Sequence, residues 1–71
     1  MRSTAVAELE GKWMTLKPHL NERQRRLLAA AEARVLGYGG ISLVAEASGL
    51  SRATIHKALE ELDAPPLQNF S

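Results

Sequence analysis

The sequence predicts a small all-α domain of four helices that contains a helix-turn-helix and no wing. Apolar residues recur at spacings of three and four in successive segments, which is the period of an amphipathic helix. Glycines, prolines and polar caps separate these segments, and no stretch resembles a strand. The chain has 71 residues, enough for one domain, and its 45% hydrophobic share is ordinary for a globular protein.

The first helix is expected at residues 4–17. Its apolar residues fall on one side, and we expect this stripe to cover the core of the other three helices: Val6, Leu9, Trp13 and Leu16. Gly11 lies inside the segment and costs about 1 kcal/mol relative to alanine. Pro18 disfavours a helical conformation at the residue before it, so the segment is expected to end at residue 17.

The second helix is expected at residues 21–36 and opens with a capping box. The side chain of Asn21 can accept a hydrogen bond from the amide of Gln24, which can reach back to the amide of Asn21. Gly37 supplies the left-handed residue that commonly closes a helix. The apolar face is expected to comprise Leu27, Leu28, Ala31, Val35 and Leu36.

The third helix is expected at residues 41–48, capped by either Gly40 or Ser42. The fourth is expected at residues 51–62, capped by Ser51, and its buried stripe comprises Ile55, Ala58, Leu59 and Leu62. Two prolines stop it at positions 65 and 66, and residues 63–71 are expected to form a loose tail. A tail with two prolines cannot form the hairpin of a winged helix, which is the nearest rival fold.

The last two helices meet the requirements of a helix-turn-helix, in which two helices cross steeply through a short turn. Ala45 is small where the second helix passes, and Gly49 can take the positive φ that the turn requires. Leu50 and Ile55 point inward and pin the two helices together, and Ser51 caps the second one. An ordinary helical hairpin would need neither a small Ala45 nor so tight a turn.

If the buried stripe of the fourth helix faces the core, its outward face lies near its N-terminal half and comprises Arg52, Ala53, His56 and Lys57. These are positions from which a recognition helix reaches base edges in the major groove. Arg52 can form a bidentate contact with guanine, and Ala53 can pack against a thymine methyl group. His56 can donate or accept a hydrogen bond, and Lys57 can contact a base or a phosphate.

Further residues are candidates for phosphate contacts. The start of the third helix offers amide groups beside Ser42. The formal net charge is only +1, but residues 17–34 carry five basic side chains and two acids, a balance of 5 − 2 = +3. Within this run, Arg23, Arg25 and Arg26 lie at the start of the second helix, where basic groups oppose the helix dipole and an anion would relieve the penalty. A solvated polar face is the alternative interpretation of these arginines.

Residues 8–62 resemble the N-terminal region of one group of bacterial insertion-sequence transposases, the Azo-thirteen type. The resemblance is carried by L-x-E-R-x-R-R-L at residues 20–27, A-A-A-E-A at 29–33, G-x-G-G-I at 37–41 and G-L-S-R-x-T-I at 49–55. It implies a DNA-binding module that precedes a much larger DDE-type catalytic domain. It also implies that Ser51, Arg52 and Thr54 face DNA, the first and last of them at the phosphates.

The chain departs from this pattern at three positions, which leaves its target DNA sequence open. His56 and Lys57 stand where relatives are rich in arginine, and Ala58 stands where glycine is frequent. A DDE site needs three carboxylates on a large sheet around metal ions, whereas this chain has one aspartate, Asp63. We therefore expect a fragment of a longer protein or a small complete one, unable to transpose DNA by itself.

Other functions are less well supported by the composition. The chain has no cysteine, and its two histidines lie on different predicted elements without metal-ligand spacing, so we expect no metal, no cofactor and no enzyme activity. No apolar run is long enough to span a membrane, and we expect a bacterial cytoplasmic protein at the nucleoid. Two alternatives remain: a small transcriptional regulator, and a protein-interaction or dimerisation module that uses the first helix.

Overall fold

The computed structural model describes residues 4–64, which form helices joined by short turns, without a strand in that range. The elements are α1 (Thr4–Leu16), the single 3-10 turn η1 (Lys17–His19), α2 (Glu22–Leu36), α3 (Gly40–Ser48) and α4 (Arg52–Asp63). The prediction of a small all-α domain with four helices is therefore confirmed. None of these helices combines the length and apolar character that crossing a membrane requires.

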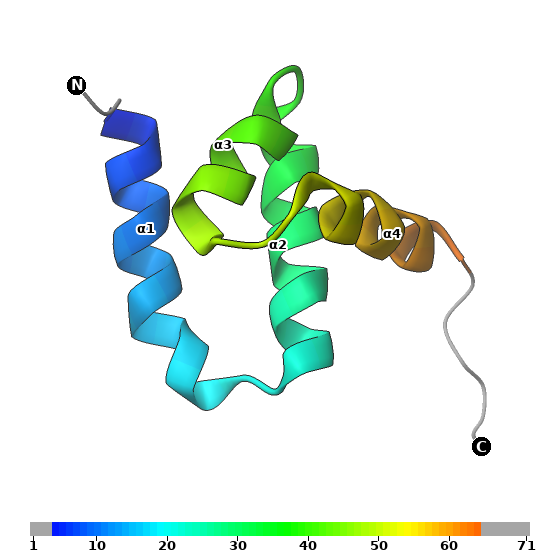
Figure 1. Cartoon of the computed structure of the whole chain (residues 1–71), viewed down its shortest axis with the longest axis horizontal. Helices are drawn as coiled ribbons and strands as arrows, with labels where there is room; N and C mark the ends of the chain where they lie inside the picture. Colours follow the sequence, from blue (N-terminus) through cyan, green and yellow to red (C-terminus); the bar gives the residue numbers. More distant parts are fainter. Residues whose placement is uncertain (1–3, 65–71) are drawn as a thin grey trace.

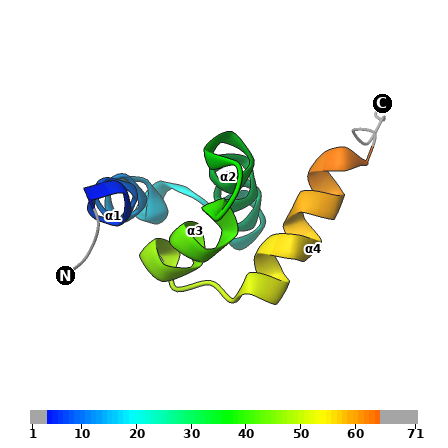
Figure 2. The same ribbon diagram turned by 90° about the horizontal axis from the view of Figure 1, so that it is seen from above.

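Helix α3 contacts each of the other three helices. Figure 1 shows α1 and α2 running in opposite directions, with α3 lying between them. The axis of α4 lies at a steep angle to that of α2. Seen from above, α1 and α4 lie on opposite sides of α3 (Figure 2). Helix α2 makes its most extensive contacts with α4 and α3, while α1 packs mainly against α3. Helix α3 therefore separates α4 from α1.

Local sequence explains where α1 ends and where α2 begins and ends. Helix α1 ends at Leu16, one residue before the predicted end, because the chain tightens into η1, with Pro18 in its first turn. Asn21 then caps α2 through the predicted box: it accepts from the amide of Gln24 at 2.8 Å, and its own amide donates to the Gln24 side chain at 2.9 Å. Gly37 closes α2 at φ 75° and donates its amide back to the carbonyl of Ala33. The predicted capping box is thus confirmed. Gly37 ends the helix with a positive φ as predicted, but its ψ of −137° lies outside the left-handed helical region.

The start of α3 corrects a prediction. The helix begins at Gly40, and its N-cap is Gly39 at φ 81°, so neither Gly40 nor Ser42 is the cap. The reason is a tight turn in which the amide of Gly40 donates to the carbonyl of Gly37 at 2.8 Å. Gly40 is also pressed against α2, because a Cβ atom there would lie 2.4 Å from the carbonyl oxygen of Ala33.

Helix α4 extends one residue beyond the predicted end. Ser51 caps it as predicted, accepting from the amide of Thr54 at 3.1 Å. Ala64 ends it in an extended conformation (φ −72°, ψ 151°), as expected for the residue before a proline. Asp63, expected in the loose tail, instead lies in α4 and forms an ion pair with Arg34 of α2. The rest of the predicted tail, where a wing would have to lie, is outside the described residues.

Each of the four helices contributes to one buried cluster that includes Trp13, Ala29, Ala33, Val44 and Ile55. Ile55 is completely buried and Trp13 is 7% exposed, so the α1 stripe does cover the core of the other helices. Tryptophan is the largest side chain in this cluster. As the only tryptophan in the chain, it also provides a fluorescence probe of unfolding.

The apolar face predicted for α2 is wrong in part. Val35 is 83% exposed and Leu36 is also exposed, whereas Ala29, Ala30 and Ala33 are buried. The physical reason is that α2 packs against both α3 and α4, so the residues between the crossing helices must be small. Larger side chains, such as Leu28, lie at the margin of the cluster, where there is room for them.

Candidate nucleic-acid interface

The turn between α3 and α4 has the positive-φ glycine and the inward-facing apolar residues that were predicted for it. Gly49 adopts φ 80° and ψ 0°, and its amide donates to the carbonyl of Ala45 at 3.0 Å. The amide of Leu50 donates to the Ser48 hydroxyl at 3.2 Å. Leu50 is half-buried and packs against the core, which also holds the fully buried Ile55. The first turns of α4 are consequently fixed to the body of the domain.

Four exposed residues lie on the side of α4 that faces solvent. Arg52 and His56 are one helical turn apart, and Ala53 and Lys57 form a parallel pair. The opposite side of the helix holds Ile55 and Ala58, which are buried in the domain. No acidic residue occurs in the sequence between positions 46 and 60, so the exposed charge on this half of α4 is positive.

A shallow hollow brings part of this face together with other elements. The hollow has a volume of about 490 Å³ and is lined by the Gly37–Gly39 corner, Ile41, Ser42, Arg52 and His56. Ser42, which is predicted to contact phosphate, therefore lines the same hollow as Arg52 and His56, which are predicted to face bases. We refer to this concavity as the corner hollow. Its lining contains hydroxyl, guanidinium and imidazole groups and no carboxylate.

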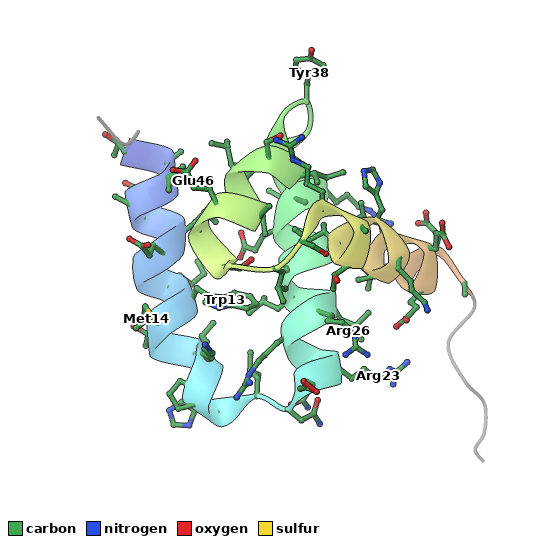
Figure 3. All side chains as sticks on the ribbon, in the orientation of Figure 1. Trp13, Met14, Arg23, Arg26, Tyr38 and Glu46 are labelled. Carbon is green, nitrogen blue, oxygen red and sulfur yellow. The ribbon has the colours of Figure 1, made fainter. Side chains whose placement is uncertain are left out.

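Tyr38 also lines the corner hollow, and it was not among the residues predicted from the sequence. Its side chain is fully exposed, and Figure 3 shows it extending outward from the tip of the corner. The sequence alone predicts no functional role for this residue, which stands between two predicted helices. The overlooked signal was a large aromatic residue placed between glycines, where it has no role in the core.

The arginines at the start of α2 are not brought to the corner hollow. Figure 3 shows Arg23 and Arg26 near the end of α2 opposite Tyr38. At about 1.5 Å per residue, the helix from Arg23 to Leu36 is about 20 Å long. Arg25 is half-buried, and its Nε donates to the carbonyl of Lys17 at 3.2 Å. The three arginines predicted to contact phosphate thus lie in the first turns of α2, whereas Ser42 lines the corner hollow that follows the last turn.

Ser51 and Thr54, which the transposase resemblance places at the phosphates, interact with each other. Besides capping α4, the Ser51 hydroxyl donates to the Thr54 hydroxyl at 2.9 Å. Ser51 is exposed and Thr54 is half-buried. The proton of the Thr54 hydroxyl can still be donated to an anion, because that hydroxyl serves as the acceptor in this pair.

A second concavity, of about 590 Å³, lies between α1 and the end of α3. It is lined by small residues, by Trp13 and Met14, and by charged groups of both signs: Glu10, Lys17 and Glu46. This mixture does not favour a polyanion. Within residues 4–64, no group of three or more histidine, aspartate or glutamate side chains is placed to hold a metal ion.

Comparison with protein-family models, with curated proteins and with solved structures finds no match to this chain.

Proposed function

We propose that this chain binds double-stranded DNA sequence-specifically, with the N-terminal half of α4 as a recognition helix in the major groove. The observation that supports the proposal most directly is the outward face of α4, which exposes Arg52, Ala53, His56 and Lys57. A groove about 12 Å wide admits one α-helix. Because Ile55 anchors α4 in the core, this face can enter the groove without disturbing the domain.

The roles of individual residues follow from their chemistry. Arg52 recognises guanine through two parallel N–H groups, and Ala53 contacts a thymine methyl group. His56 contacts a base edge, and Lys57 contacts a base or a phosphate. Ser42, at the start of α3, donates to the phosphate backbone, together with amides of the first helical turn that have no acceptor within the helix.

The resemblance of residues 8–62 to Azo-thirteen-type transposases favours a more specific role. We propose that the domain recognises the end of a mobile element, as the DNA-binding module of a transposase or a fragment of one. A small transcriptional regulator would use the same helix and would differ in its target, an operator instead of a transposon end. Either protein would act at the nucleoid of a bacterial cell.

The remaining alternative, dimerisation through the apolar stripe of α1, is disfavoured by burial. Val6 and Trp13 of this stripe are both in the interior of the domain. A second copy of the chain could reach them only if α1 detached from α3. The stripe therefore serves the core, and any dimer of this protein would need another surface.

The proposed function predicts salt-dependent binding to duplex DNA. Each phosphate neutralised by a lysine or arginine releases a counterion, so a plot of log K against log salt should have a negative slope of about −0.9 for each such contact. A fluorescence-anisotropy titration with labelled duplexes, at several salt concentrations, measures this slope. Duplexes selected from a random pool should bind more tightly than unselected ones. Failure to bind any duplex at low salt would contradict the proposal, and so would a failure of selection to enrich any sequence.

A further inference from the structure

Tyr38 has no structural role that accounts for its presence at the tip of the corner. Its side chain is 106% exposed relative to the reference for tyrosine, so it contributes nothing to the core. Met14, Val35 and Leu36 are the other large hydrophobic residues exposed in the described part of the chain, and Tyr38 exceeds them all. A side chain with a large apolar ring and a hydrogen-bonding tip is well suited to a partner surface that is partly polar.

The backbone holds Tyr38 in a defined position. Gly39 has φ 81° and ψ −5°, values typical of the third residue of a type II turn, which places Tyr38 at the second position. The turn is closed by the hydrogen bond from Gly40 to Gly37. On one side Gly37 is bonded to the end of α2, and on the other Gly40 is packed against α2. The corner is therefore a constrained turn that presents one aromatic side chain.

The surroundings of Tyr38 indicate which partner it contacts. In the corner hollow it shares the lining with Ser42, Arg52 and His56, each of which can donate a hydrogen bond. With no carboxylate in this lining, the hollow suits an anion with several acceptor oxygens. A phosphodiester backbone is such an anion, and tyrosine hydroxyl groups are among the donors that contact it in protein–DNA complexes.

We propose that the phenolic hydroxyl of Tyr38 donates a hydrogen bond to a DNA phosphate beside the base pairs that α4 reads. This inference rests on the proposed function and adds a backbone contact to it. Because the corner is fixed to α2 and precedes α3, a phosphate held there sets the position of α4 along the groove. Tyr38 is then a positioning residue that carries no sequence information itself.

The test compares Tyr38→Phe, which removes only the hydroxyl, with Tyr38→Ala, which also removes the ring. We expect Tyr38→Phe to bind about tenfold more weakly, the usual effect of losing a hydrogen bond to a charged group. The loss should be equal on selected and unselected duplexes. The slope of log K against log salt should stay the same, because a neutral hydroxyl displaces no counterion. Tyr38→Ala should lose at least as much.

Met14→Ala is the matched control, since Figure 3 places this exposed side chain on α1, away from the corner. It should bind both duplexes as the unmodified protein does. Tyr38→Phe binding with unchanged affinity would overturn the proposal, as would a loss confined to selected duplexes, which would indicate a base contact. If Arg52→Ala weakens binding while Tyr38→Phe does not, only the Tyr38 contact is refuted. If the unmodified chain binds no duplex, the proposed function and this contact both fail.

Discussion

Replacing Gly40 with alanine is expected to destabilise the domain by about 1–3 kcal/mol, the usual cost of forcing atoms into a packed site. The added Cβ would lie 2.4 Å from the carbonyl oxygen of Ala33 and 2.9 Å from the Cβ of Leu36. The first of these atoms belongs to a helix backbone and cannot turn aside. Helix α3 would have to move away from α2 and disturb the corner between them.

This loss is large for a small protein, because stability of the order of 0.1 kcal/mol per residue gives only about 7 kcal/mol in total. A decrease of 2 kcal/mol corresponds to a fall in Tm of roughly 8–16 °C. Urea unfolding followed by Trp13 fluorescence, together with thermal unfolding followed by circular dichroism, measures both quantities.

Gly11→Ala is the matched control for Gly40→Ala. Gly11 also lies within a helix, but a Cβ built there would meet no atom within 4 Å beyond its chain neighbours and the nearby backbone of its own helix. Alanine should therefore stabilise the domain by up to about 1 kcal/mol through helix propensity. If Gly40→Ala proves as stable as the unmodified protein, the close approach of α3 to α2 is wrong. If both substitutions stabilise the domain, helix propensity alone decides the outcome.

Arg52→Ala is expected to weaken binding to a selected DNA site by about 1–3 kcal/mol, the value of one bidentate contact with guanine. Binding to unselected DNA should change less, because those duplexes do not place guanine opposite Arg52. Specificity should therefore be relaxed at one position of the site. Anisotropy titrations on the selected duplex and on single-base variants of it measure both effects.

Arg23→Ala is the matched control for Arg52→Ala, since it removes the same side chain and the same charge. Arg23 lies at the opposite end of α2 from Tyr38 (Figure 3), so any phosphate contact that it makes should be lost equally on every duplex, without a change in specificity. An equal loss from Arg52→Ala on every sequence would make Arg52 a phosphate contact. A larger loss from Arg23→Ala would place the DNA on the other end of α2 and contradict the proposed interface.

The sequence predicted those features that depend on short-range chemistry. Asn21 and Gln24 form the capping box, and Ser51 caps α4, because both motifs are decided within one helical turn. The positive φ of Gly49 was predictable because few other residues adopt that conformation without cost. The exposure of Arg52 and His56 followed from the helical period once Ile55 was assigned to the core.

Features that depend on distant contacts were not predictable. The exposure of Val35 is decided by α3 and α4, which pack on the alanines of α2 and leave no room for a larger residue. The start of α3 depends on how closely Gly40 approaches Ala33, which no local pattern reveals. The role proposed for Tyr38 likewise depends on Arg52 and His56, which are distant in sequence and which the fold places in the same hollow.

We propose that duplex DNA lies against the corner hollow and the outward face of α4. Chemical-shift mapping by NMR tests it most directly, with ¹⁵N-labelled protein titrated with a selected duplex. The largest amide shifts are expected at residues 38–42 and 51–57, with small shifts on α1. Shifts concentrated in the concavity between α1 and α3, around Glu10 and Glu46, would contradict this interface.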